Sequence, residues 1–238
     1  KRLGLDMQRV KAVFISHEHG DHIGGLARLH KTFQLPVYIT PQTLRNCNLM
    51  LQQKHLVNSF TKNRSVEIGS LTITPFSKSH DADDPHSFMI SCNEIHVGVI
   101  TDIGYACEEV MKCFKQCNAV FLEANYCEEM LENGNYPFYL KKRISSNTGH
   151  LSNAQALEVF LKHRSDRLQL LILSHLSKNN NRPELVNRLF NEHAAGVQII
   201  VAGRDKETDV FEIKAGKQMP VLQMKKTYKK HEAQLSLF

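Results

Sequence analysis

The chain has 238 residues, of which 42% are hydrophobic and 23% are charged, which is enough apolar material for one large domain or two small ones. No apolar stretch is long enough to span a bilayer and the first residues do not resemble a secretory signal, so composition excludes a membrane protein and predicts a soluble one. The six cysteines form no Cys-x-x-Cys pair. They are too few for a disulfide scaffold, which predicts reduced thiols in a cytoplasmic protein.

The basic charge is concentrated at the C-terminal end. The formal net charge is +6, and residues 214–238 carry six lysines and one glutamate, which leaves the first 213 residues close to neutral. A basic balance suits a polyanionic partner. We therefore expect one catalytic domain over residues 1–213, followed by a basic, flexible tail over residues 214–238.

Short apolar runs rich in Val, Ile and Leu predict buried strands. In chain order these runs are Val10–Ser16, Ser70–Phe76, Ile95–Thr101, Ala119–Leu122, Gln169–Ser174, Gln198–Ala202 and Val210–Ile213. Segments with helical periodicity lie at Leu26–Phe33, Glu108–Cys117, Ala154–His163 and Pro183–His193. Ser152 is placed to cap the third of these helices, and Pro183 suits the first position of the fourth. Strands that alternate with helices predict an α/β protein whose sheets are covered by helices.

The first predicted strand runs directly into a segment rich in metal ligands, Ser16-His17-Glu18-His19-Gly20-Asp21-His22. Residues at the carboxyl end of a strand turn into the crevice where α/β proteins bind their ligands. Three imidazoles and a carboxylate suit Zn²⁺, Mn²⁺ or iron. The spacing favours two ions, with His17 and His19 directed to one ion and Asp21 and His22 to the other.

Further candidate ligands follow later strands. His80 comes after the second predicted strand, Asp102 after the third, and His175 after the fifth. An aspartate after a wholly apolar strand is costly to bury unless a cation offsets its desolvation. A position between two metal ions would provide that compensation for Asp102.

This order of ligands resembles the metallo-β-lactamase superfamily. The resemblance implies an α/β fold, the αβ/βα four-layer sandwich of that superfamily, and two divalent metal ions. The implied ligands are His17, His19 and His80 for one ion, Asp21, His22 and His175 for the other, and Asp102 as the bridge. Members of the superfamily begin with several strands, whereas only nine residues precede the first predicted strand here. The resemblance therefore also implies that N-terminal strands are missing from this chain.

Two other residues favour phosphodiester hydrolysis within that superfamily. Glu123 lies at a strand end, and His150 precedes a helix in the run Gly149-His150-Leu151-Ser152. They resemble the Glu-His pair of RNase Z-type phosphodiesterases, which donates a proton to the departing alkoxide. Asp21 is then expected to orient the attacking hydroxide, and His150, held by Glu123, to protonate the leaving sugar oxygen. A capping-region histidine without chemistry is the alternative for His150.

Longer segments resemble a narrower family, the YycJ/WalJ-type exonucleases, which are similar to RNase Z without its tRNA-binding arm. The matching segments are residues 79–85, 101–105, 123–125, 136–137, 141–144, 149–153 and 175–180. The resemblance implies a DNA exonuclease of replication or repair that acts on duplex DNA. Lys141, Arg143, Lys178 and Asn179 are candidates for phosphate contacts. An ordinary solvated surface is an equally good interpretation of these four residues.

The chain ends in Gln234-Leu235-Ser236-Leu237-Phe238. This run resembles the short peptide with which bacterial replication and repair proteins bind the sliding clamp. Leu235, Leu237 and Phe238 are apolar anchors at the end of a polar tail, where disordered segments seldom carry them. With Gln234, they are the predicted clamp-binding residues.

Three alternative functions stay open. A thioesterase or lactonase would leave the Glu123–His150 pair and the basic tail unexplained. An RNA-processing nuclease is less favoured because the chain lacks the arm of RNase Z. A non-catalytic clamp or DNA adaptor would have a broken ligand set, whereas the set here is complete. Nitrogen and oxygen ligands admit Zn²⁺ and Mn²⁺ alike, so the identity of the metal stays open.

Overall fold

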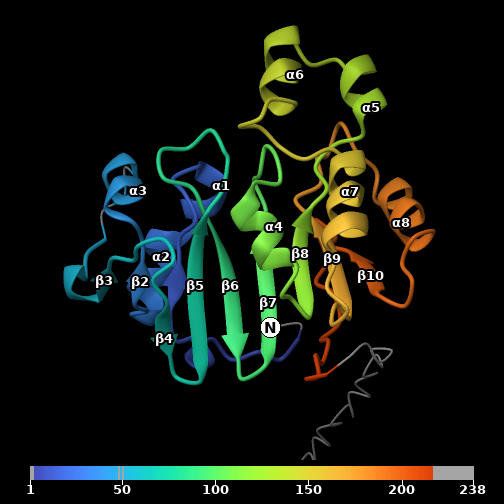
Figure 1. Ribbon diagram of the computed structural model, residues 1–238. Coiled ribbons are helices and arrows are strands. Elements are labelled where there is room, and N and C mark those ends of the chain that lie inside the picture. Colours follow the sequence, from blue (N-terminus) through green and yellow to red (C-terminus); the bar gives the residue numbers. More distant parts are fainter. Residues whose placement is uncertain (1–2, 48, 50, 217–238) are drawn as a thin grey trace, which may run out of the picture.

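The computed structural model describes residues 3–47, 49 and 51–216. Two sheets form its framework (Figure 1). The smaller sheet has the parallel order β1-β2-β3, with β1 at Val13–Phe14, β2 at Val37–Tyr38 and β3 at Val57–Asn58. The larger sheet has the order β10-β9-β8-β7-β6-β5-β4. Its strands are β4 (Val66–Ile68), β5 (Leu71–Ser77), β6 (His86–Cys92), β7 (Ile95–Ile100), β8 (Ala119–Glu123), β9 (Leu170–Ser174) and β10 (Gln198–Val201).

Strand direction in the larger sheet brings several loops to one edge. β5, β6 and β7 are antiparallel neighbours, and β7 to β10 are parallel. Because β5 and β7 both oppose β6, the strands β5, β7, β8, β9 and β10 run in the same direction. The segments that leave their carboxyl ends therefore meet at the same edge of the sheet.

The helices fall into three groups. Their bounds are α1 Gly20–Ile23, α2 Leu26–Phe33, α3 Pro41–Asn46, α4 Glu108–Phe114, α5 Glu128–Asn133, α6 Phe138–Ile144, α7 Asn153–His163 and α8 Pro183–Asn191, with short 3₁₀ turns at Met7–Arg9 and Lys54–Leu56. α4, α7 and α8 pack on the larger sheet, and α1, α2 and α3 pack on the smaller one. α5 and α6 project beyond the sheets at the top of Figure 1.

The apolar cores arrange these elements in layers. Helices α4, α7 and α8 pack against strands β7 to β10 through Phe114, Phe160 and Phe190, respectively. A second cluster packs Phe14 and Tyr38 of the smaller sheet against residues of β4, β5 and β6. The layers therefore lie in the order helix, sheet, sheet, helix. The predicted α/β architecture is confirmed. Burial of these side chains, each about 1.5–3 kcal/mol relative to exposure, supplies most of the drive to assemble the layers.

Local signals predicted two helix starts correctly. The Ser152 hydroxyl accepts a hydrogen bond from the Gln155 amide at 3.2 Å, and the Gln155 side chain accepts one from the Ser152 amide at 2.9 Å. Pro183 occupies the first turn of α8, where its missing N–H costs nothing. Within the described residues, the longest helix, α7, has 11 residues, and no helix has the length and apolarity to cross a membrane. All six cysteines are free, as predicted.

One predicted strand is wrong. Residues Val210–Ile213 have no strand partner among the described residues and run as an irregular segment after β10. Phe211 and Ile213 nevertheless contact the apolar residues of β8 and β9, which accounts for their hydrophobic pattern. The backbone of Lys214 is bound by a side chain instead of a strand, since Gln169 donates to its carbonyl at 2.7 Å and accepts from its amide at 3.3 Å.

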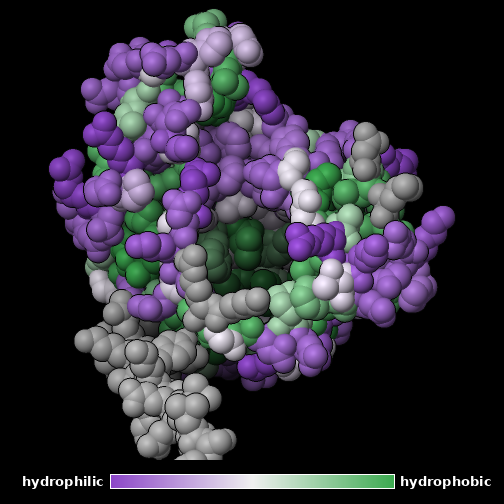
Figure 2. Space-filling model, turned by 180° about the vertical axis from the view of Figure 1, so that it is seen from behind, coloured by the Kyte–Doolittle hydropathy of each residue, from purple (hydrophilic) through white to green (hydrophobic). Residues whose placement is uncertain are grey.

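Other predicted bounds were too long, and several short elements were missed. Val10–Ser16 contains only the two-residue β1, and the helices predicted to end at Cys117 and His193 end at Phe114 and Asn191. The missed elements are β2, β3, β4, β6, α1, α3, α5 and α6. Figure 2 shows a hollow with a hydrophobic floor on the back of the molecule.

Candidate metal centre

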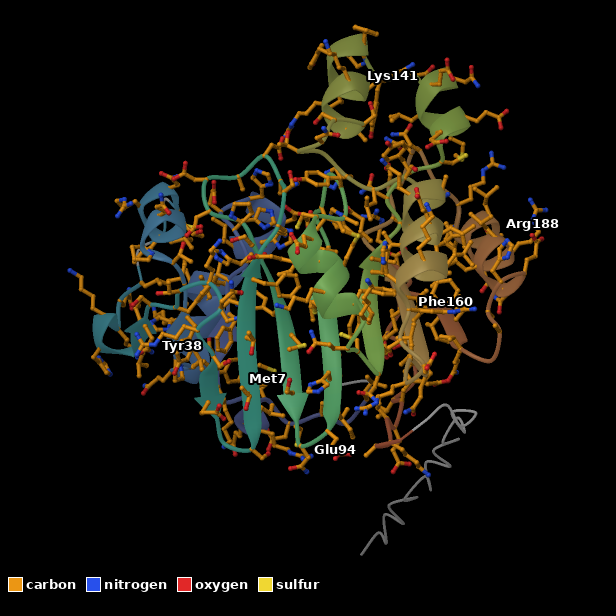
Figure 3. All side chains as sticks on the ribbon, viewed as in Figure 1. Met7, Tyr38, Glu94, Lys141, Phe160 and Arg188 are labelled. Atoms are coloured by element: carbon orange, nitrogen blue, oxygen red, sulfur yellow. The ribbon has the colours of Figure 1, made fainter. Side chains whose placement is uncertain are left out.

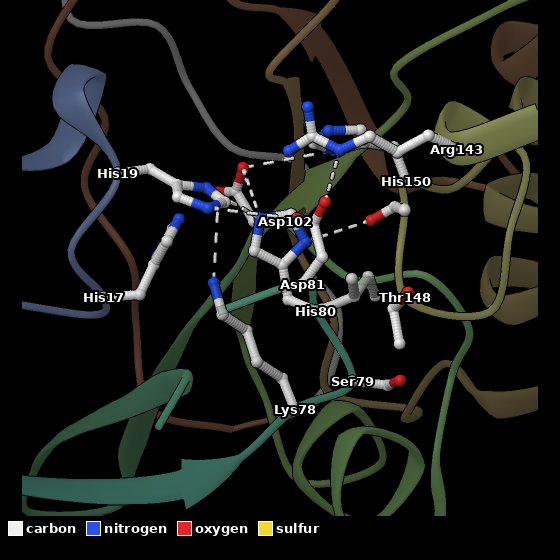
Figure 4. A network of polar contacts seen from close by, with 12 residues as sticks. His17, His19, Lys78, Ser79, His80, Asp81, Asp102, Arg143, Thr148 and His150 are labelled. Atoms are coloured by element: carbon white, nitrogen blue, oxygen red, sulfur yellow. Dashed lines mark hydrogen bonds and ion pairs between the residues drawn. The ribbon is translucent and has the colours of Figure 1, made fainter. Parts of the chain in front are cut away.

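The seven side chains predicted as metal ligands come together at the shared edge of the sheets. Figure 4 shows four of them, His17, His19, His80 and Asp102. β1 leads into the loop and short helix α1 that carry four of them. The other three follow β5, β7 and β9, whose carboxyl ends lie at the same edge. The Ser16 carbonyl accepts a hydrogen bond from the His86 amide at 2.9 Å, which joins the loop after β1 to the start of β6.

One group consists of His17, His19 and His80, whose ligand nitrogens lie within 4.8 Å of one another. His80 Nε2 is 3.3 Å from His19 Nδ1, and the Nδ1 atom of His80 contacts the Gly149 carbonyl at 3.1 Å. Such a second contact fixes the orientation of a ligating imidazole. Burial lowers the pKa of His17 to about 2 and that of His80 to about 4, which keeps both rings neutral, as metal ligation requires.

A second group consists of Asp21, His22 and His175, again within 4.8 Å. Asp21 Oδ2 lies 3.5 Å from His22 Nε2 and 3.6 Å from His175 Nε2. The Ser16 hydroxyl joins the two groups, since it lies 3.0 Å from His17 Nδ1 and 3.1 Å from His22 Nδ1. The sequence analysis did not single out Ser16. The only signal for it is that a residue with a hydroxyl group stands immediately before the run of candidate ligands.

Asp102 lies between the two groups and is 2% exposed. Its Oδ1 atom is 3.4 Å from His175 Nε2 and 3.9 Å from His80 Nε2, and its Oδ2 atom is 3.3 Å from His22 Nε2. Burial alone would raise the pKa of this carboxyl, but the hydrogen bond and charges around it, from His22 and Lys78 above all, hold it well below its ordinary value. Asp102 and His175 both have a positive φ, of 55° and 57°, where the chain turns sharply at the end of a strand.

The arrangement fits divalent cations. The Nε2 atom of His17 is buried and makes no hydrogen bond with any residue that the structure describes. An orphaned imidazole nitrogen is costly in a protein interior unless it has a ligand to bind. Imidazole nitrogens and carboxylate oxygens are the donors that zinc and manganese accept. The two groups, with Asp102 between them, are consistent with a dinuclear metal site.

A buried lysine, which the sequence analysis did not single out, lies beside Asp102. Lys78 Nζ is 3.9 Å from Asp102 Oδ2 and donates a hydrogen bond to the Thr101 carbonyl at 2.8 Å, and its side chain is 1% exposed. Burial lowers the pKa of its ammonium group to about 8. Lysine is almost never fully buried unless it is paired, so its position here shows how strongly Asp102 needs a positive neighbour.

Replacement of Lys78 by methionine should destabilise the protein more without metal than with it. In EDTA the substitution removes the buried ammonium group beside Asp102, and loss of one partner of a buried pair costs about 3–5 kcal/mol. With Zn²⁺ or Mn²⁺ present, the added cations compensate Asp102 and the cost should shrink. Urea unfolding under the two conditions measures the difference. Lys162→Met on the exposed face of α7 is the control; an equal cost with and without metal would contradict the expectation.

Glu123 is fully buried and contacts two histidines rather than one. Its Oε1 atom accepts hydrogen bonds from His150 Nδ1 at 2.7 Å and His175 Nδ1 at 2.8 Å. Its Oε2 atom accepts from the Ile103 amide at 2.9 Å and the Leu151 amide at 3.3 Å. Burial acts to raise the pKa of this carboxyl, but the bonds from the two histidines lower it overall. The sequence paired Glu123 with His150; the contact with His175 arises because β8 and β9 are parallel with Glu123 opposite Ser174.

A cavity of about 600 Å³ opens beside His150 and His175. Asp21, Asn125, Lys178 and Arg204 are among the residues that line it. The opening therefore combines the edge of the metal-ligand groups with basic and amide side chains. Arg204 was missed by sequence reasoning, although its place just after β10 follows the same strand-end rule as the candidate ligands.

The other three predicted phosphate contacts do not line this cavity and have partners of their own. Asn179 donates to the Tyr136 hydroxyl at 2.9 Å. Arg143 Nε contacts Asp81 Oδ2 at 2.5 Å, and Asp81 Oδ1 lies 3.5 Å from His80 Nε2. Lys141 donates a hydrogen bond to a backbone carbonyl of α5 at 2.6 Å, so its ammonium group is bound within the projecting helices.

Comparison with known proteins agrees with this geometry. The family model described as the beta-lactamase superfamily domain matches residues 1–175. The chain belongs to the metallo-β-lactamase superfamily. It is therefore a metal-dependent hydrolase, and the predicted superfamily is confirmed.

Several members of the superfamily are similar over most of the chain. Exodeoxyribonuclease YycJ of Bacillus anthracis is 32% identical over 206 residues, which cover 83% of this chain and 77% of the relative. Exodeoxyribonuclease WalJ of Streptococcus pneumoniae is 32% identical over 183 residues, 74% of this chain and 67% of the relative. The crystal structure of the metallo-β-lactamase fold protein YhfI from Bacillus subtilis has a TM-score of 0.62 at 18% identity and covers 81% of this chain and 75% of that one, which shows the shared fold.

The predicted clamp-binding residues of this superfamily member, Gln234, Leu235, Leu237 and Phe238, lie outside the residues that the structure describes. The same holds for most of the predicted basic tail, which the structure describes only up to Gly216.

Proposed function

We propose that this hydrolase is a dinuclear metal-dependent phosphodiesterase that degrades DNA from an end, with duplex DNA as its substrate and a role in replication or repair. The observation that carries the proposal is the hydrogen bond from His150, which lines the 600 Å³ cavity beside the two groups of candidate ligands, to the buried Glu123. The similarity to proteins named exodeoxyribonucleases supports the choice of DNA.

We propose the same metal ligands that the sequence resemblance implied. His17, His19 and His80 would hold one divalent ion, Asp21, His22 and His175 the other, and Asp102 both. A bound pair of divalent ions supplies an activated water near neutral pH and neutralises negative charge on the phosphate oxygens. Zn²⁺ and Mn²⁺ both suit these donors.

The protein's own groups would position the reactants and move protons. Asp21, the most exposed of the candidate ligands with a side chain 64% accessible, is placed to orient the attacking water. Glu123 holds the Nδ1 proton of His150, which leaves Nε2 free to protonate the departing sugar oxygen. A thioester releases a thiolate, which leaves more readily than the alkoxide of a phosphodiester, so this proton donor favours the phosphodiesterase over the thioesterase.

Basic side chains beside the cavity would contact the DNA backbone. Lys178 and Arg204 line the 600 Å³ cavity, and Arg143 lines a second, smaller cavity of about 230 Å³ that also has His150 in its wall. Asn179 and Lys141 are proposed as weaker contacts because each already has a partner. Contacts of this kind position the backbone without reading sequence.

The full-length chain should degrade end-labelled linear duplex DNA with Mn²⁺ or Zn²⁺, and EDTA should stop the reaction. Covalently closed circular DNA is the matched substrate without an end, and it should stay intact. A tRNA precursor tests the RNA-processing alternative in the same assay. Hydrolysis of a thioester by a protein that leaves every nucleic acid intact would overturn the proposal.

We also propose that Gln234, Leu235, Leu237 and Phe238 bind the bacterial sliding clamp, with the lysine-rich segment before them as a tether. The support is the sequence resemblance alone. Deletion of residues 234–238 should abolish binding to purified clamp and leave hydrolysis of DNA unchanged. Clamp binding that survives the deletion would refute the proposal.

A further inference from the structure

The outer face of α6 carries two of the most exposed aromatic side chains in the described part of the chain. Phe138 is 80% exposed and Tyr139 is 72% exposed. Leu140 and Ile144, on the opposite side of the same helix, are half-buried and line the smaller cavity with Tyr136 and His150. The helix therefore packs by its aliphatic face and presents its aromatic face to solvent, which reverses the usual distribution for large apolar rings.

A basic side chain shares this face. Residues four apart on a helix are neighbours, so the exposed Lys142 lies beside Phe138, whereas Arg143 is turned toward Asp81 on the inner side. α6 has no acidic residue, whereas the adjacent α5 has exposed glutamates at 128, 129 and 132. A polyanion would be repelled along α5 and attracted along the outer face of α6.

α6 is connected directly to the candidate active site. The Ile144 carbonyl accepts a hydrogen bond from the His150 amide at 2.9 Å. The backbones approach so closely that a Cβ on Gly149 would lie 2.2 Å from that carbonyl oxygen. Arg143 contacts Asp81, which borders the histidine groups (Figure 4). Figure 3 shows α6, marked by Lys141, standing beyond the sheet edge where the site lies.

We propose that the outer face of α6, formed by Phe138, Tyr139 and Lys142, binds unpaired nucleotides of the DNA substrate next to the site of hydrolysis. The inference rests on the proposed nuclease function and adds to it that the enzyme holds a separated strand at the end of the duplex. Aromatic rings stack on any base, and neighbouring cations bind the phosphates between the bases. Bases inside a duplex are already stacked on both faces, so this surface discriminates unpaired from paired DNA.

The test compares binding of a blunt duplex with binding of the same duplex carrying a short unpaired extension, made with either polarity. Fluorescence anisotropy of the full-length protein in EDTA reports affinity without hydrolysis, and a 2-aminopurine base in the extension reports stacking by quenching. The wild type should prefer the extended duplex and quench the probe. Phe138→Leu combined with Tyr139→Leu should weaken binding of the extension roughly 10-fold, as expected for loss of base stacking, and abolish the quenching, while blunt duplex binding is unchanged.

Matched variants separate stacking from folding and from general apolarity. Phe138→Tyr with Tyr139→Phe keeps both rings and should behave like the wild type. Phe33→Leu removes an exposed ring at the end of α2, outside this face, and should change nothing. Circular dichroism in EDTA checks that each variant is folded.

Three results distinguish failure of this inference from failure of the nuclease proposal. If the wild type degrades linear DNA but the double leucine variant retains both the preference for extensions and the quenching, the inference is overturned and the nuclease proposal stands. If the wild type degrades no DNA, the nuclease proposal fails regardless of the binding result. A wild type that degrades DNA without any preference for extensions would also overturn the inference and would leave a protein partner as the occupant of this face.

Discussion

Replacement of Asp102 by asparagine should reduce DNA hydrolysis by about 10²–10³-fold or more, comparable to the removal of a preorganised charge-stabilising group from other enzymes. The amide keeps the shape of the carboxylate but removes the negative charge that lies within 3.9 Å of His80, His22 and His175. A neutral side chain cannot hold two cations close together against their mutual repulsion. The bound metal should therefore fall below two ions per chain in the variant.

Metal content by mass spectrometry and hydrolysis of end-labelled duplex should fall together. Asp166→Asn, at an exposed position of the loop after α7, is the matched control and should change neither. Circular dichroism separates loss of metal from loss of fold, because the substitution also leaves Lys78 without its buried partner. A folded Asp102→Asn protein with two metals and full activity would contradict the proposed bridging role.

Replacement of His150 by alanine should slow turnover by about 10²–10⁴-fold, the contribution of a positioned general acid. The metal content should stay unchanged, because His150 is not among the proposed ligands. The loss should depend on the leaving group. A DNA strand releases an alkoxide that needs a proton, whereas a p-nitrophenyl ester of thymidine phosphate releases a stable phenolate that does not.

The decisive measurement is therefore the ratio of wild-type to variant rates on the two substrates. A large ratio on DNA and a small ratio on the p-nitrophenyl ester would assign the proton to His150. His163→Ala, at the end of α7 and outside the groups of candidate ligands, controls for loss of a histidine as such. Equal ratios on both substrates would refute the general-acid role and favour the alternative of a histidine without chemistry.

The main strands and the ligand order could be predicted because they depend on local pattern. Apolar runs predicted five strands of the larger sheet. The residues that follow these strands were expected at one edge of the sheet, because the carboxyl ends of parallel strands lie at the same edge. Val210–Ile213 misled the same reasoning, since its apolar residues pack on β8 and β9 without joining the ladder. Hydrophobicity reports burial, and burial does not require strand pairing.

Contacts between distant segments were beyond local pattern. The double hydrogen bond of Glu123 to two histidines depends on the register of β8 with β9, which the separate strands do not specify. A lysine is normally expected on the protein surface. Lys78 lies in the interior, and the buried charge of Asp102 explains that position. The contact between Arg143 and Asp81 spans 62 residues and depends on how α6 is placed beyond the sheet.

The positive φ angles of Asp102 and His175 lower the stability of the fold. Residues other than glycine lose roughly 1–2 kcal/mol in the left-handed region, and both of these residues adopt it directly after a buried strand. Selection for thermal stability alone would favour glycine at both positions. The carboxylate and the imidazole at these positions therefore lower the stability of the fold, and their proposed role as metal ligands accounts for their presence there.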